Sequence, residues 1–141
     1  MSFKLHSRLQ SDSIEIGRFT LSRLLLINDS QYPWFVLVPE RVDITEIYQL
    51  PEQDQVQLQH ESSILAKTLA ETFNADKMNI AAIGNMVPQL HIHHIVRYKN
   101  DIAWPAPVWG KFDAIPYTES QLKKIEATLL NGLKGHLKSE N

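Results

Sequence analysis

The chain has 141 residues, of which 43% are hydrophobic and 21% are charged, and this composition is that of one ordinary globular domain. Its 14 Lys and Arg residues against 16 Asp and Glu residues give a formal net charge of -2 at pH 7. This near balance argues against broad nucleic-acid binding, which usually needs a basic excess. Because there is no cysteine, disulfides, thiolate zinc sites and cysteine nucleophiles are excluded.

The sequence also predicts no targeting signal and no flexible linker. The residues from Met1 to Arg8 lead into no apolar stretch of signal-peptide length, and no run reaches the roughly 18 apolar residues of a membrane span. We therefore expect a cytoplasmic protein. No internal repeat or low-complexity linker divides the sequence, so we expect a single domain over residues 1–141.

Three strand-like segments occupy the first third of the chain. Residues 14–19 alternate apolar and polar, whereas residues 24–27 form a continuous apolar run that suits a strand covered on both faces. Residues 34–38 are aromatic or β-branched and stop at Pro39. Turn-forming residues 28–30 separate the last two segments. This pattern predicts antiparallel strands joined by short connections.

The period changes to that of a helix between residues 51 and 73. Apolar or small residues recur there at helical spacing, at Leu58, Ser62, Leu65, Leu69 and Phe73. Strands are expected again at residues 79–83 and 90–97. A C-terminal helix over about residues 118–138 is predicted by a capping box of Thr118 and Gln121 and by an apolar face. That face comprises Leu122, Ile125, Leu129, Leu133 and Leu137. The order of elements predicts an α+β fold with an antiparallel sheet.

The segment from Gln89 to Arg97 carries the chemistry. It reads Gln-Leu-His-Ile-His-His-Ile-Val-Arg and holds three of the 6 histidines within four positions. In a strand, Gln89, His91 and His93 project from one face, whereas the residues between them face the core. Two imidazoles and an amide on one face of an apolar strand carry a desolvation cost that a purely structural role does not need.

Three interpretations of these histidines compete. They could be satisfied or exposed side chains of an edge strand. They could supply two ligands of a metal site, but no carboxylate lies between Gln89 and Asn100 to complete the set, and the remaining histidines are distant in sequence. In the third interpretation, an imidazole that titrates near neutral pH attacks phosphorus or shuttles protons.

The segment resembles the signature of the histidine-triad family, His-φ-His-φ-His-φ-φ, where φ is hydrophobic. Residues 84–89 (Gly-Asn-Met-Val-Pro-Gln) are similar to the family's Gly-Gln-Ser/Thr-Val-x-His lead-in, and residues 95–97 are similar to its apolar-Pro-Arg exit. Upstream, residues 26–28, Pro33 and residues 36–39 resemble the family's strand, Asn turn and second strand. The resemblance implies a histidine-triad fold with a sheet of about five strands, one inserted helix and a C-terminal helix.

This resemblance assigns the catalytic roles. His91 stands at the central histidine, the nucleophile that takes the nucleotidyl group, and His93 at the third histidine, which assists the phosphate or the leaving group. We therefore expect a hydrolase of nucleoside polyphosphates or phosphoramidates, or a nucleotidyl transferase, that needs no cofactor. The alternative to this enzymatic function is a nucleotide-binding module with weak or no catalytic activity. The absence of a Gly-rich lysine loop argues against P-loop chemistry.

The resemblance also suggests nucleotide-binding residues. Asn28 is similar to the turn residue near the ribose, Leu26 to an apolar wall of the base pocket, and Asn85 to an amide donor near the phosphate. Gln89 is a further candidate donor. Each position also has a simpler interpretation, since Asn28 could be a plain turn former, Leu26 a core residue and Asn85 part of a bend.

Three positions depart from the family pattern. Gln89 occupies the first histidine position, and a glutamine cannot relay a proton by titrating. Trp34 and Phe35 stand where the family usually has Gly-His, and His94 occupies a position that is normally apolar. The resemblance further implies a homodimer whose sheets join edge to edge. Residues 104–110, which contain two tryptophans, could cover the site, build a dimer contact or pack on their own core.

Overall fold

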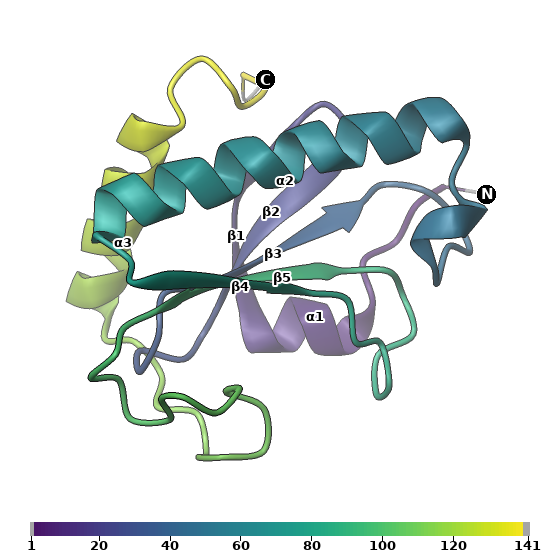
Figure 1. The fold of residues 1–141 in the computed structure, drawn as a ribbon. Helices are drawn as coiled ribbons and strands as arrows, with labels where there is room; N and C mark the ends of the chain where they lie inside the picture. Colours follow the sequence, from purple (N-terminus) through teal and green to yellow (C-terminus); the bar gives the residue numbers. More distant parts are fainter. Residues whose placement is uncertain (1, 140–141) are drawn as a thin grey trace.

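Two layers of unequal thickness cover a central antiparallel sheet in the computed structural model, which describes residues 2–139 (Figure 1). The sheet has five strands in the order β1-β2-β3-β5-β4, and every neighbouring pair is antiparallel. The strands are β1 (Ser13–Arg18), β2 (Ser22–Ile27), β3 (Trp34–Pro39), β4 (Lys77–Ala81) and β5 (Ile92–Arg97). The predicted α+β class and antiparallel sheet are therefore confirmed.

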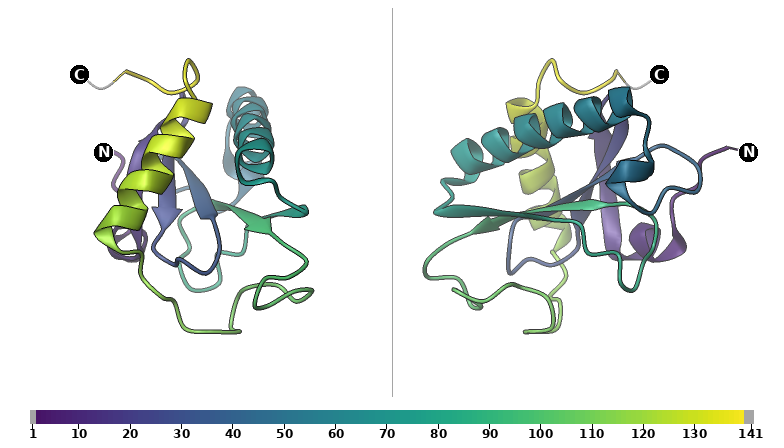
Figure 2. Two further views of the ribbon diagram at one scale, coloured as in Figure 1. Left: turned by 90° about the vertical axis from the view of Figure 1, so that its left-hand side faces the viewer. Right: turned by 45° about the vertical axis from the view of Figure 1, so that its right-hand side comes forward.

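Helices cover one face of this sheet. Helix α2 (Glu52–Phe73) and helix α3 (Glu119–Gly132) lie over the same side, as Figure 2 shows, and a short 3-10 helix, η1 (Ile47–Gln49), precedes α2. The predicted apolar face of α2 is the buried one, and Leu65 and Leu69 are fully enclosed. Burying a leucine side chain stabilises the fold by roughly 1.5–3 kcal/mol. This face of α2 therefore packs against the sheet and forms part of the main hydrophobic core.

The C-terminal helix begins as predicted and ends earlier. The Thr118 side chain accepts from the Gln121 backbone N–H, as a capping box requires. The helix stops at Gly132, and Gly135 adopts a positive φ of 90° in the turn that follows. A Cβ on Gly132 would lie 2.9 Å from a methyl group of Thr68, so glycine is needed where α3 crosses α2.

The opposite face of the sheet has a different cover. The N-terminal segment, with the unpredicted helix α1 (Ser7–Asp12), packs Leu9 against Leu25 and Val36. The long connection between β5 and α3 places Val108 against Ile95. Figure 1 shows both on the side of the sheet away from α2. Within residues 2–139, no helix is long and apolar enough to cross a membrane.

Candidate functional site

His91 and His93 lie on the face of the sheet that the N-terminal segment and the β5–α3 connection cover. Their ring centroids are 4.8 Å apart, which confirms that alternate side chains of this segment share a face. Leu90 and Ile92 belong to a separate apolar cluster with Leu58 of α2. The imidazoles are mostly covered, with His91 7% exposed and His93 6% exposed.

The backbone fixes the tautomer of His91. Its Nδ1 lies 2.7 Å from the carbonyl oxygen of Gln89, and because a carbonyl can only accept, Nδ1 carries the proton. Burial lowers the pKa of His91, the Gln89 carbonyl raises it, and the nearby His6 lowers it again. His91 is therefore a neutral imidazole whose Nε2 holds a lone pair. No other hydrogen-bond partner among the described residues takes that nitrogen.

The opposite tautomer is imposed on His93. The indole N–H of Trp34, on the neighbouring strand β3, donates to Nδ1 of His93 at 3.0 Å. An indole can only donate, so the proton of neutral His93 is on Nε2. Burial, followed by the proximity of His91 and His94, lowers the pKa of His93 to about 3. The two histidines thus offer complementary groups, a lone pair on His91 and an N–H donor on His93.

A cavity of about 460 Å³ lies beside Trp34 and Trp109, and neither His91 nor His93 is part of its lining. Trp34 and Trp109 form part of its wall and also contact His93, with ring centroids 5.8 Å and 5.1 Å from it. The cavity volume falls within the range of small-molecule sites, about 300–1,000 Å³. Further lining residues are Ile27, Asn28, Asp29, Phe112 and Pro116. An aromatic cavity of this size can hold a flat ring, and its wall residues Trp34 and Trp109 place that ring next to His93.

The segment of residues 104–110 covers the site. Arg97 fixes its start through bonds of 2.8 Å and 3.0 Å to the carboxylate of Asp101 and of 2.8 Å to the carbonyl of Ala106. Trp109 then lies over His93, and Trp104 lies beside the Arg97 guanidinium. Of the three roles considered for this segment, the structure shows two within the chain, because Trp109 covers His93 and Val108 packs with Ile95 in an apolar cluster.

The predicted nucleotide-binding residues are dispersed. Asn28 lines the cavity, and its side-chain oxygen accepts from the Tyr117 backbone N–H at 2.9 Å. Leu26 is fully buried in the core under α2, whereas its neighbour Ile27 lines the cavity. Asn85 is exposed on the loop between β4 and β5. The continuous apolar run of β2 could not indicate which of its residues faces the cavity.

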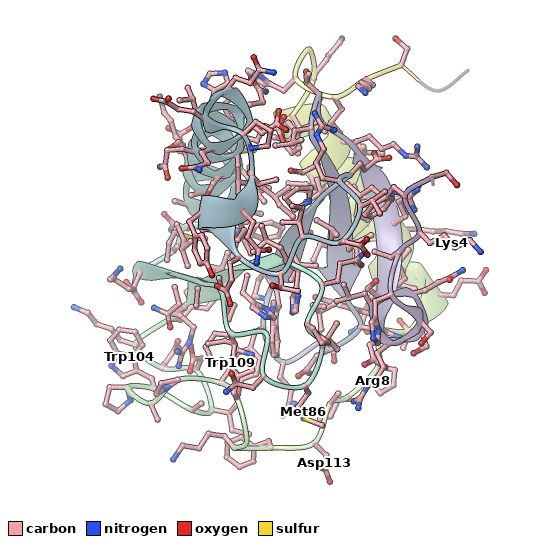
Figure 3. All side chains as sticks on the ribbon, turned by 90° about the vertical axis from the view of Figure 1, so that its right-hand side faces the viewer. Lys4, Arg8, Met86, Trp104, Trp109 and Asp113 are labelled. Atoms are coloured by element: carbon pink, nitrogen blue, oxygen red, sulfur yellow. The ribbon has the colours of Figure 1, made fainter. Side chains whose placement is uncertain are left out.

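Gln89 is engaged elsewhere in the site. Its side-chain oxygen accepts from the His6 backbone N–H at 2.8 Å, and its NH₂ donates to the Lys4 carbonyl at 2.8 Å. The amide thus holds the N-terminal segment against the end of β5. Figure 3 shows Lys4 and Arg8 at the right of the view, and Trp104 and Trp109 toward the left.

Sequence reasoning missed three contributors to this site. In the sequence, Trp34 is only a departure from the family pattern, Trp109 only part of an aromatic segment, and His6 only a histidine distant from the motif. The cluster of tryptophan and proline in residues 104–110 was the one available signal. Nothing in the sequence indicates that a residue 83 positions before Gln89 would meet it.

His94 lies on the other face of β5, under α2. It is fully buried, its Nδ1 donates to the carbonyl of Ile92 at 3.0 Å, and its Nε2 lies 2.7 Å from the hydroxyl of Ser62. Since Nδ1 carries the proton, the Ser62 hydroxyl donates to Nε2. Burial lowers the pKa of His94 to about 4, against the opposing effect of the Ile92 carbonyl. Within residues 2–139, no three His, Cys, Asp or Glu side chains are grouped as a metal site would require.

Comparisons with known proteins agree with this fold. The family model of the HIT domain matches residues 8–100. A histidine triad protein from Marinobacter aquaeolei VT8 is 50% identical, with a TM-score of 0.94 over 96% of this chain and 99% of that chain. No curated protein sequence matches the chain.

Two further solved structures are similarly close. A histidine triad protein from Bradyrhizobium japonicum is 44% identical, with a TM-score of 0.92 over 94% of this chain and 98% of that chain. One from Sinorhizobium meliloti 1021 is 41% identical, with a TM-score of 0.91 over 93% of this chain and 97% of that chain.

Proposed function

The chain belongs to the histidine-triad family, whose members are generally nucleotide-binding hydrolases and transferases, and we propose that it cleaves nucleoside phosphoanhydrides or phosphoramidates through His91. The observation that carries this proposal is the pair of tautomers. The Gln89 carbonyl holds the proton of His91 on Nδ1, and the Trp34 indole holds that of His93 on Nε2.

The reaction follows as a double displacement. The Nε2 lone pair of His91 attacks the α-phosphorus of the nucleotide, a P–N bond forms, and the bond to the leaving group breaks with its electron pair. The leaving group takes its proton from solvent water. A second water then attacks the same phosphorus, the P–N bond breaks and returns the lone pair to Nε2 of His91, and the proton of the attacking water passes to solvent. In a transferase, an acceptor hydroxyl replaces this water.

His93 serves this reaction as a neutral donor. Because its pKa is about 3, it does not act as a titrating acid near pH 7. Its Nε2–H instead donates to the phosphate oxygens, on which negative charge develops in the transition state. One such donor is typically worth about 3–4 kcal/mol of the activation barrier. The aromatic cavity lined by Trp34, Trp109 and Asn28 holds the nucleoside in this account.

Turnover and binding measured together test the proposal. Wild type and His91→Asn are compared for hydrolysis of adenosine 5′-phosphoramidate and a dinucleoside polyphosphate, and for binding of AMP. In the variant, the Asn amide can replace Nδ1–H as the donor to the Gln89 carbonyl, but no attacking nitrogen remains. The proposal expects turnover in wild type alone and AMP binding in both. AMP binding without turnover in wild type would instead establish the alternative, a nucleotide-binding module.

We propose a homodimer as the assembly. Strand β4 forms one edge of the sheet, and Ile80 on it is 50% exposed. Val56 of α2 and Ile83 beyond β4 are exposed hydrophobic residues as well. An unpaired apolar strand edge is a surface that another strand can pair with. Light scattering is expected to give twice the chain mass, and a monomer mass would contradict this proposal.

A further inference from the structure

The N-terminal segment brings a third imidazole to the site. The backbone N–H of His6 donates to the Gln89 side chain at 2.8 Å, and the backbone carbonyl of Gln89 accepts from His91 at 2.7 Å. One residue therefore connects His6 and His91, although they are far apart in the chain. The NH₂ group of Gln89 also donates to the Lys4 carbonyl, so this side chain bonds the segment at both Lys4 and His6.

The ring of His6 has a defined tautomer. Its Nδ1 accepts a hydrogen bond from the Arg8 backbone N–H at 3.1 Å, as the N-cap of α1. Nδ1 is therefore unprotonated, and the proton of the neutral ring is on Nε2. Among the described residues, no protein group takes this Nε2–H, and the side chain is only partly buried. The ring thus has one N–H donor left for another partner.

The position of His6 relative to His91 suggests which group accepts from this Nε2–H. Gln89 is hydrogen-bonded to both residues, to the backbone of His6 through its side chain and to the ring of His91 through its carbonyl, and His6 is among the groups that lower the pKa of His91. A phosphate attacked by Nε2 of His91 has oxygens on several sides, and His93 approaches it from the side of Trp109. The N-terminal segment comes from another direction, since Figure 3 shows Lys4 and Arg8 at the right of the view and Trp109 toward the left.

We propose that His6 is a nucleotide-contacting residue whose Nε2–H donates to the phosphate held at His91, with Gln89 as the clamp that positions it. This inference rests on the proposed function. It assigns a role to the glutamine at the first histidine position. That glutamine lends no side chain to the substrate and instead brings in an imidazole from the N-terminal segment.

Two substitutions separate this role from a structural one. In His6→Asn, the side-chain oxygen lies where Nδ1 was and can still accept from the Arg8 N–H, but the distal donor is lost. In His6→Gln, the side-chain NH₂ lies where Nε2–H was, while the local cap is weakened. A purely structural histidine is therefore tolerated better as Asn, whereas a phosphate donor is tolerated better as Gln.

The affinity for AMP, followed by the fluorescence of Trp34 and Trp109, is the first measurement, and the turnover of adenosine 5′-phosphoramidate is the second. We expect His6→Asn to weaken AMP binding about tenfold or more and to lower kcat/KM at least as much, with an unchanged Tm. His6→Gln is expected to retain more affinity than His6→Asn. His60→Asn, at an exposed position of α2, is the matched control and should match wild type.

The outcomes distinguish the two proposals. If His6→Asn binds AMP as wild type does, or if His6→Gln loses as much affinity as His6→Asn, the role of His6 is overturned and that of His91 is untouched. If wild type binds AMP without turnover, the hydrolase proposal fails, and the role of His6 is decided by affinity alone. If wild type binds no AMP, both proposals fail.

Discussion

His91, directly before strand β5, and His94, within it, make the same local hydrogen bond but have different surroundings. On one face, His91 donates through Nδ1 to the carbonyl two residues earlier, and on the other face His94 does the same. The difference lies in the second nitrogen. The Ser62 hydroxyl occupies Nε2 of His94, whereas no protein group among residues 2–139 occupies Nε2 of His91. A buried imidazole that donates to a carbonyl can therefore act as a nucleophile only where its other nitrogen is accessible.

Substituting each of the two histidines in turn gives the largest expected difference in activity. His91→Asn should lower kcat by at least about 10³-fold, because the attacking lone pair is lost, while Tm stays close to that of wild type. His94→Leu should leave kcat within a few fold, because this side chain faces α2 rather than the cavity. Steady-state kinetics and thermal melts of both variants make the comparison. A large loss of turnover in His94→Leu would contradict the division between the two faces.

The pH dependence of stability sharpens the same comparison. The folded-state pKa of His94 is about 4, whereas the ordinary value is 6.5. Between these two pH values, the imidazole of His94 is therefore protonated in the unfolded chain and neutral in the folded chain. Stability from this group is complete above pH 6.5 and is lost as the pH falls toward 4, by on the order of 2–3 kcal/mol.

His94→Leu should therefore flatten the urea-unfolding free energy between pH 6.5 and 4. His93, whose pKa is lowered to about 3, leaves a residual slope in both proteins. If the unfolding free energy depends on pH equally in wild type and in His94→Leu, the pKa of His94 is not lowered in the folded protein.

Removing the partner of His94 tests its hydrogen bond. Ser62→Ala should destabilise the fold by about 1–3 kcal/mol at pH 7, because it leaves Nε2 of a fully buried imidazole without a donor. Ser63→Ala, at the next and exposed position of α2, is the control and should change stability little. Chemical denaturation measures both, and equal effects would contradict a specific bond to His94.

The smallest expected effect concerns the tautomer of His93. Trp34→Phe keeps an aromatic wall for the cavity but removes the N–H that donates to Nδ1 of His93. The proton of His93 can then move to Nδ1, and kcat/KM should fall about fivefold to tenfold. Nitrogen chemical shifts of labelled histidine report the tautomer. If Trp34→Phe leaves both the tautomer and kcat/KM unchanged, the indole does not set the proton of His93.

The sequence predicted the parts of this molecule that follow a simple period. The helical spacing of α2 identified its buried face, and the alternation at residues 89–93 placed His91 and His93 together. The structure assigns Ile27 rather than Leu26 to the cavity wall, because a continuous apolar run carries no alternation. The helix predicted to 138 stops at Gly132, although Leu137 still packs against the core.

Contacts between distant segments could not be predicted in this way. The bonds from Gln89 to Lys4 and His6 join residues more than 80 positions apart, and the six-residue helix α1 is too short to show a period. The placement of Trp109 on His93 depends on how Arg97 holds Asp101 and Ala106. Such contacts are set by tertiary structure rather than by local pattern.

The most direct measurement is the chemical identification of the covalent intermediate. Wild type is mixed with adenosine 5′-phosphoramidate, quenched in alkali to preserve a P–N bond, digested and mapped by mass spectrometry, with His91→Asn as the control. The account predicts one adenylylated peptide, modified at His91 and absent from the variant. An adenylyl group on another residue, or turnover with no modified peptide at any quench time, would contradict it.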